Sequence, residues 1–216
     1  MGRLRTLFDT LAERRPPGLR RGELAPITGW QHTPDVSHGT RGLTIGVLVY
    51  RGVSSSEIDE PLRRLANRLA ADVVLVGASP GRLHAVEPSR SVEVSCVPAD
   101  APPIDVLVVP GGLGWKQVID DPVIRTWLRD AAADARGILA MSTGSLLLAS
   151  VGRLDGREAT GHWLADGELA ALGATVTSTR TASDDAGRVV TASGALAAIQ
   201  VVDELADHAR WAEWMP

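Results

Sequence analysis

The chain has 216 residues, a formal net charge of -4 and one cysteine, Cys96. This length suits a single domain that buries roughly 70–75% of its unfolded surface, so neither a disulfide nor a structural metal is needed to hold a core. The acidic balance argues against a nucleic-acid surface, and no apolar run approaches the roughly 20 residues that span a bilayer. Residues 1–20 lack the apolar middle of a signal peptide, and no Cys and His lie at zinc-ligand spacing. We therefore expect a cytoplasmic protein without a metal, cofactor, membrane or nucleic-acid partner.

The first 41 residues differ from the rest of the chain. Residues 3–14 carry leucines and a phenylalanine at helical spacing, which predicts a short amphipathic helix. Prolines and glycines interrupt regular structure through residues 15–41. We expect 1–41 to be an extension that lies on the core or on a partner subunit, followed by a domain at 42–210 and a tail at 211–216.

The first half of this domain alternates apolar strands with one helix. Residues 43–50 form a near-continuous apolar run, which is typical of a strand buried on both faces. A helix is expected over 57–70, with Ser54, Ser55 or Ser56 as its N-cap. Residues 73–77 predict a second buried strand, and residues 82–97, which include Cys96, predict a hairpin or edge pair.

The second half continues the same alternation. Residues 104–109 predict a third central strand that ends in a glycine-rich turn at 110–114. Asp121 then caps a helix to about residue 134, and 137–141 is the fourth central strand. The remaining expected elements are helices at 143–151, 163–172 and 194–208 and strands at 175–177 and 188–191. This pattern predicts an α/β fold in which helices cover both faces of a mostly parallel sheet.

Three candidate groups follow the carboxyl ends of predicted strands. Glu57 follows the first strand, Gly111 and Gly112 follow the third central strand, and Ser142 follows the fourth. Open parallel sheets bind ligands at this edge. The convergence of the three groups predicts a site there.

Ser142 stands where an apolar strand meets an apolar helix, which is the position of a nucleophile elbow. The pattern Ala140-x-Ser142-x-Gly144 departs from G-x-S-x-G by one residue. Serine is also a favoured helix N-cap, so capping is the structural alternative.

The other two groups also allow a structural and a functional interpretation. Gly111 and Gly112 could simply form a tight turn, or their backbone N–H groups could stabilise a developing oxyanion. Glu57 could favour a helix N-terminus through the helix dipole, or it could be a buried carboxyl group that acts as a general acid or base.

Two aromatic positions leave the same choice open. His162, in Thr160-Gly161-His162-Trp163, could act as a base or could be a structural histidine. Trp115, just after the glycine turn, could form a wall of the substrate pocket or belong to the core.

From about residue 43 to residue 208, the chain resembles the PfpI/ThiJ superfamily of class I glutamine-amidotransferase-like proteins, and within it the isonitrile hydratase branch. Four blocks carry the resemblance in the same order along the chain. They are IGVLVYRGV at 45–53 with Glu57 and Pro61, VPGGLG at 109–114, STGSLLLA at 142–149, and GRLDGREATGHW at 152–163.

The resemblance implies a flavodoxin-like three-layer α/β sandwich that is usually dimeric, with a nucleophilic cysteine at the elbow and an acidic residue beside it. Ser142 stands where that cysteine is expected, and Glu57 stands where the hydratase branch usually carries aspartate. A serine hydroxyl is essentially never ionised and needs a positioned base, whereas about 3% of a free thiol is ionised at neutral pH. Cys96 is far from the elbow in sequence and does not replace the thiol.

We therefore expect a small-molecule enzyme that does not use the family's thiol chemistry and that catalyses hydration, dehydration or hydrolysis at a polarised carbon. Glu57 would be the general acid and base, and Ser142 the nucleophile or a hydrogen-bonding positioner. The backbone of Gly111, Gly112 and Thr143 would bind an oxyanion. Substrate contacts are expected from three further residues: Leu113, Trp115 and His162.

Two other functions remain open from the sequence. One is a non-catalytic ligand-binding or sensing protein that lost its thiol. The other is serine-dependent hydrolysis with His162 as the base, against which the hydratase resemblance argues. In each case we expect a homodimer.

Overall fold

The computed structural model describes residues 25–26, 42–87, 89–184 and 187–207. A six-stranded sheet forms its centre, with the strands in the order β10-β11-β7-β6-β2-β3. All neighbouring strands are parallel except β10 and β11, which are antiparallel. The strands are β2 (Thr44–Leu48), β3 (Asp72–Val76), β6 (Val106–Val109), β7 (Gly137–Met141), β10 (Thr181–Ser183) and β11 (Val189–Ala192).

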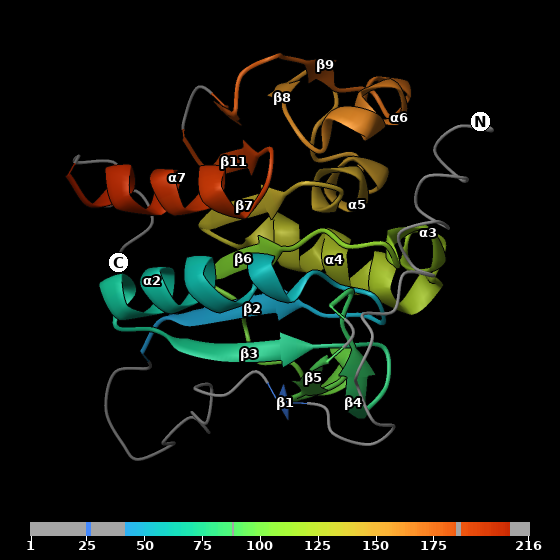
Figure 1. Cartoon of the computed structure of the whole chain (residues 1–216), viewed down its shortest axis with the longest axis vertical. Helices are drawn as coiled ribbons and strands as arrows, with labels where there is room; N and C mark the ends of the chain where they lie inside the picture. Colours follow the sequence, from blue (N-terminus) through green and yellow to red (C-terminus); the bar gives the residue numbers. More distant parts are fainter. Residues whose placement is uncertain (1–24, 27–41, 88, 185–186, 208–216) are drawn as a thin grey trace.

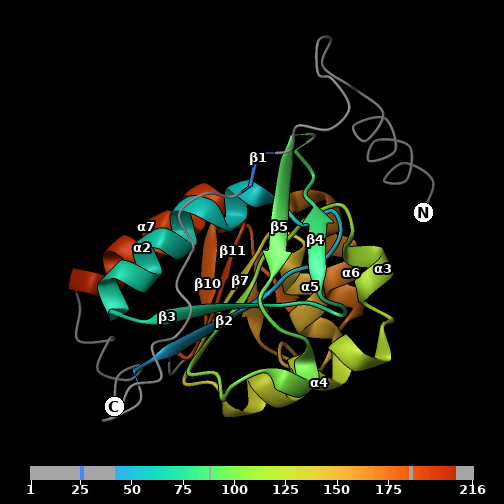
Figure 2. The ribbon, with the colours of Figure 1, turned by 90° about the horizontal axis from the view of Figure 1, so that it is seen from below.

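Helices cover both faces of this sheet (Figures 1 and 2). On one face α2 (Asp59–Leu69) packs against α7 (Ala195–Asp207), and on the other lie α4 (Pro122–Asp134) and α5 (Gly144–Ser150). The predicted three-layer, mostly parallel α/β sandwich is therefore confirmed. The shorter helices are α3 (Trp115–Val118) and α6 (Asp166–Ala171), with single 3-10 turns η1 (Ser55–Glu57), η2 (Pro98–Asp100) and η3 (Trp163–Ala165).

Burial on both faces explains the near-continuous apolar strands. Every residue of β2, β6 and β7 is buried, which is what helices on both sides of a parallel sheet require. Complete burial of one such aliphatic side chain contributes roughly 1.5–3 kcal/mol. Helix α4 begins as predicted, because Asp121 Oδ1 accepts hydrogen bonds from the N–H groups of Val123 (2.9 Å) and Ile124 (3.1 Å).

A smaller sheet, in the order β1-β5-β4, lies beside β3 (Figure 1). The predicted hairpin is present as β4 (Gly81–His84) and β5 (Arg90–Val94), which pair antiparallel, and β1 (Ala25–Pro26) pairs parallel with β5. Cys96 lies just beyond β5 and forms an isolated bridge with Val76 at the edge of the central sheet. Its thiol pKa is raised by burial and by the nearby charge of Asp100.

The strand expected at 175–177 is present as β9 (Thr175–Val176), which pairs with β8 (Glu158–Ala159) in a separate two-stranded sheet. The antiparallel edge strand β10 was not predicted, because its three partly polar residues show no readable periodicity.

The predicted amphipathic helix at 3–14, most of the extension 1–41 and the tail 211–216 lie outside the described residues. Within the described ranges, no helix combines the length and apolar character that a membrane crossing needs. Among the same residues, no three His, Cys, Asp or Glu side chains are placed to share a metal ion.

Candidate active site

Ser142 is held in a strained turn between β7 and α5. Its φ is 54°, and the only other non-glycine residue with positive φ in the described part of the chain is Ala70. Such a conformation costs roughly 1–2 kcal/mol for a residue with a side chain. The backbone anchors the turn, since Ser142 N–H donates to the Ala192 carbonyl at 2.8 Å. The elbow predicted from the sequence is therefore present.

The helix-cap alternative for Ser142 is wrong. The N-cap position of α5 is Thr143, and no side chain caps this helix. The turn also explains the glycine that follows: a Cβ on Gly144 would lie 2.0 Å from the carbonyl oxygen of Val109. Gly144 therefore lets α5 start directly against the end of β6.

Glu57 points its carboxyl group toward this elbow from η1. It is only 7% exposed, and its Oε2 accepts a hydrogen bond from Gly111 N–H at 2.6 Å, with the Ser142 hydroxyl nearby. Burial raises the pKa of Glu57 from 4.5 to about 7, although the Gly111 hydrogen bond and the Ser142 hydroxyl oppose the shift. The carboxyl group is consequently near half-protonation at neutral pH, which a role confined to the helix dipole would not require.

The glycine turn after β6 places two backbone amides beside the elbow. Gly111 N–H is used by Glu57, and Gly112 N–H donates to Thr143 Oγ1 at 2.9 Å. Gly112 has a φ of 151°, and a Cβ there would lie 2.2 Å from the Gly52 carbonyl oxygen. Two of the three amides expected to bind an oxyanion therefore donate to acceptors within the protein. No hydrogen bond from Thr143 N–H to an acceptor in the described part of the chain is formed, so the third expected amide is not used internally.

Tyr50 is a buried member of the site that the sequence interpretation missed. Its hydroxyl donates to the Pro110 carbonyl at 3.0 Å, and the Thr143 side chain lies near it. Burial, with a further contribution from the charge of Glu57, raises its pKa well above 10. It is the chain's one tyrosine and directly follows the first strand, which is the signal that could have identified it.

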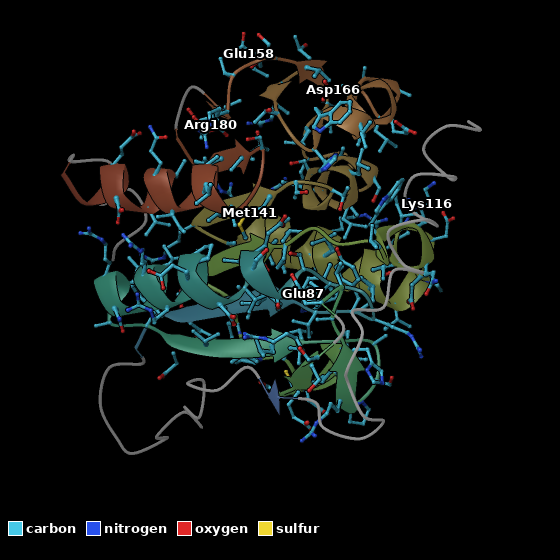
Figure 3. All side chains as sticks on the ribbon, in the orientation of Figure 1. Glu87, Lys116, Met141, Glu158, Asp166 and Arg180 are labelled. Atoms are coloured by element: carbon cyan, nitrogen blue, oxygen red, sulfur yellow. The ribbon has the colours of Figure 1, made fainter. Side chains whose placement is uncertain are left out.

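Glu87 is a second residue that was missed. It lies in the β4–β5 hairpin, and Figure 3 places it close to the N-terminal end of α2. Its carboxylate accepts hydrogen bonds from the N–H groups of Ser55 (2.9 Å) and Ser56 (3.4 Å). Burial alone would raise the pKa of Glu87, but these hydrogen bonds hold it below its usual value. The predicted serine cap is not formed, since Ser54 makes no side-chain capping bond to η1.

The three residues expected to contact substrate lie on different segments. Trp115 begins α3 and packs half-buried against the core, and Leu113 is half-buried in the preceding turn. His162 follows Gly161, which packs against the Ser142 carbonyl. Its Nδ1 accepts a hydrogen bond from Leu164 N–H at 3.3 Å, and burial lowers its pKa.

An exposed aromatic side chain adjoins this histidine. The ring of Trp163 stacks on that of His162 with centroids 6.0 Å apart, yet Trp163 is 71% exposed. A buried network fixes the same segment to the elbow helix, because Ser145 Oγ donates to the Thr160 carbonyl at 2.8 Å. The position of His162 is thus tied to α5.

Together these groups suit proton transfer to and from a small molecule. Glu57 can donate or accept a proton near neutral pH, the Ser142 hydroxyl adjoins it, and Thr143 N–H can bind a developing negative charge.

Comparisons with known proteins agree with this architecture. The profile of the DJ-1/PfpI family matches residues 44–208. An isonitrile hydratase from Pseudomonas putida is 32% identical over 173 residues, which cover 77% of this chain and 72% of that protein. An uncharacterised protein encoded in the cpoL 5' region of Streptomyces lividans is 33% identical over 54% of this chain and 85% of its own length.

Solved structures show the same fold. A ThiJ/PfpI family protein from Pseudomonas syringae has a TM-score of 0.70 at 24% identity, with 82% of this chain and 75% of the other covered. DJ-1 from Schizosaccharomyces pombe has a TM-score of 0.64 at 17% identity, with 80% and 95% covered.

Proposed function

Because the chain belongs to the DJ-1/PfpI family, we propose that it is a small-molecule enzyme that adds water to a polarised carbon. Isonitriles are the first substrate class to test, since the Pseudomonas putida relative is an isonitrile hydratase. Related dehydration or hydrolysis belongs to the same chemical class, because each transfers protons at such a carbon.

The single observation that carries the proposal is the environment of Glu57. A carboxyl group with a pKa of about 7, buried beside a hydroxyl group, is suited to act first as an acid and then as a base. A residue that only stabilised a helix end would be exposed and ionised at neutral pH.

In the proposed reaction, the Glu57 carboxyl group gives its proton to the terminal carbon of R–N≡C, and a C–H bond forms. The oxygen of a water molecule then forms a bond to the same carbon, and the proton it releases returns to the Glu57 carboxylate. The resulting R–N=CH–OH tautomerises to the formamide R–NH–CHO. One water molecule is consumed, and Glu57 ends in its protonated form.

Ser142 and Thr143 would support this transfer. The Ser142 hydroxyl, which lies beside the Glu57 carboxyl group, would position that group and the attacking water, while Thr143 N–H would donate a hydrogen bond to the oxygen that adds to the substrate carbon. Leu113, Trp115 and His162 would line the substrate site, and a homodimer would be the working form.

A covalent route through Ser142 is the alternative use of the same groups. The serine oxygen would attack the protonated carbon and give R–N=CH–O–Ser142, which water would then cleave. In the first step Glu57 would give its proton to the isonitrile carbon, and the resulting carboxylate would take the proton of the serine hydroxyl, as serine requires. In the second step Glu57 would protonate the imidate nitrogen and take a proton from the attacking water, after which the carbon–oxygen bond to Ser142 breaks, the serine oxygen regains a proton and the formamide R–NH–CHO is released. Intact mass after rapid quenching distinguishes the routes, because only the covalent route adds the mass of the isonitrile to the protein.

Loss of the isonitrile stretching band, followed for alkyl and aryl isonitriles, tests the proposal. We expect the parent to turn over at least one of them, and Glu57→Gln to lose activity by roughly 100-fold or more. Glu93→Gln, at an exposed position of β5, is the matched control, and Ser150→Ala, at the end of α5, is the control for Ser142→Ala. Equal activity of the parent and Glu57→Gln would contradict the proposal.

A non-catalytic ligand-binding role is the second candidate, and the glycine turn favours it. The N–H groups of Gly111 and Gly112 both donate to side-chain oxygens of the protein, so only part of the expected oxyanion site remains for a ligand. In that case Ser142→Ala and Glu57→Gln would bind a ligand as the parent does, with no turnover in any of the three proteins.

A further inference from the structure

The turn that carries Glu57 lacks a cap of its own. Turn η1 spans three residues, and the first N–H groups of any such turn have no partner within it. Ser54 occupies the N-cap position but makes no side-chain capping bond; its hydroxyl is instead hydrogen-bonded to that of Ser56 at 2.9 Å. Another group must therefore satisfy the amides that precede Glu57.

Glu87 supplies that group from the neighbouring hairpin. One oxygen, Oε2, accepts from Ser55 N–H at 2.9 Å, and the other, Oε1, accepts from Ser56 N–H and from the Ser54 hydroxyl, both at 3.4 Å. Bonds from backbone amides to a carboxylate are charge-assisted and stronger than neutral ones. The carboxylate of Glu87 thus accepts hydrogen bonds from three consecutive residues at the start of the turn.

Further contacts hold the hairpin and the turn together. Val86 N–H donates to the Val53 carbonyl at 2.9 Å, and Gly52 N–H donates to the His84 carbonyl at 2.7 Å. At the other end of the hairpin loop, Arg90 forms an ion pair with Asp59 in the first turn of α2. The contacts flank Glu87 on both sides and fix its approach to the turn.

We propose that Glu87 is a positioning residue that holds η1 so that the Glu57 carboxyl group meets Gly111 N–H and the Ser142 hydroxyl. Glu87 acts through Glu57 and is not itself a proton donor in the reaction. This inference rests on the proposed role of Glu57. It adds that a residue of the β4–β5 hairpin determines where the Glu57 carboxyl group lies.

Charge gives Glu87 a second effect on its neighbour. The ionisable groups that face Glu57 are Tyr50 from the end of β2 and Glu87 from the hairpin, and Asp59 with its partner Arg90 lies next to Glu87. Glu87 is ionised near neutral pH because its pKa is lowered, so it disfavours ionisation of Glu57. Both effects of Glu87 therefore raise the pKa of Glu57. Its charge disfavours ionisation of Glu57, and its hold on η1 keeps the Glu57 carboxyl group away from solvent.

Carboxyl ¹³C NMR titration of Glu57, with its signal identified by its loss in Glu57→Gln, measures both effects without a substrate. We expect Glu87→Gln to lower the pKa of Glu57 by about one unit. The amide exchange rates of Ser55 and Ser56 should rise roughly tenfold, as expected when a bond to a charged acceptor is lost. Glu93→Gln, which removes a carboxylate from the same hairpin that pairs with Arg82 and not with η1, should change neither quantity.

A shorter acid keeps the test decisive if Glu87→Gln does not fold. Glu87→Asp retains the charge but withdraws it by one methylene, so the two amides should still exchange faster and the pKa of Glu57 should still fall, by a smaller amount. An unchanged Glu57 pKa in the folded variants, or an equal change in Glu93→Gln, would overturn the inference. If the shifts occur while Glu57→Gln retains full turnover, the proposed function fails and the role of Glu87 in positioning Glu57 stands.

Discussion

Replacing Glu57 by glutamine should change the way in which the stability of the fold depends on pH. Glu57 in the folded chain holds its proton up to about pH 7, whereas in the unfolded chain it releases the proton near its ordinary pKa of 4.5. Between these values the folded state binds more protons than the unfolded state, so its stability falls as the pH rises. The stabilising contribution is complete below the unfolded pKa and is lost as the pH passes the folded pKa.

The size of the effect follows from the raised pKa. A change from 4.5 to about 7 corresponds to about 3 kcal/mol, because each unit is worth about 1.4 kcal/mol. Urea unfolding of the parent and of Glu57→Gln near pH 4 and near pH 8 measures this quantity. The parent should lose about 3 kcal/mol relative to the variant over that range, with Glu93→Gln as the control for removing a carboxylate. A difference below about 1 kcal/mol, or one of opposite sign, would refute the buried, protonated Glu57.

Three further predictions concern the elbow, the glycine after it and the cap of α4, and equilibrium unfolding measures each of them. Ser142→Gly should be about 1 kcal/mol more stable than Ser142→Ala, because both lose the hydroxyl but only glycine relieves a φ of 54°; equal stability would argue against strain. Gly144→Ala should cost about 3 kcal/mol or more, since its Cβ would lie 2.0 Å from the Val109 oxygen, whereas Gly167→Ala in α6, with nothing within 4 Å, should gain about 0.5–1 kcal/mol; similar effects at both glycines would contradict the close approach. Asp121→Ala should cost about 1 kcal/mol through loss of the α4 cap, and an unchanged free energy of unfolding would show that the two capping bonds contribute nothing.

The central strands and the elbow could be predicted from the sequence for physical reasons. Strands buried on both faces must be apolar throughout, so β2, β6 and β7 stand out as runs bounded by polar or glycine-rich turns. Parallel strands bring their carboxyl ends to one edge, which is why Glu57, the glycine turn and Ser142 meet. Asp121 was recognisable because an acidic residue before proline is a strong local signal for a helix start.

Interactions between segments that lie far apart in the chain could not be predicted from the sequence. Glu87 lies 32 positions from Ser55, in a polar hairpin whose orientation relative to η1 does not follow from the sequence. The residues around Glu87 therefore do not indicate that it replaces a serine cap. The internal acceptors of Gly111 and Gly112 likewise depend on how closely η1 and α5 approach the glycine turn. The pairing of β9 with β8 was hidden because each strand has only two residues, too few to show a period.

The serine at the elbow makes Glu57 the centre of the proposed chemistry. A thiol can be partly ionised without help, whereas Ser142 would depend on the neighbouring Glu57 carboxyl group. Activity would therefore follow the protonation state of Glu57, with Glu87 setting where that group lies and how readily it ionises.

The pH dependence of kcat/KM for isonitrile hydration tests this claim most directly. If protonated Glu57 must supply the proton to the substrate carbon, kcat/KM should be constant at low pH and fall as the pH rises through about 7. A turnover reaction whose kcat/KM stays level through that pH, or whose midpoint lies near 4.5, would contradict Glu57 as the acid.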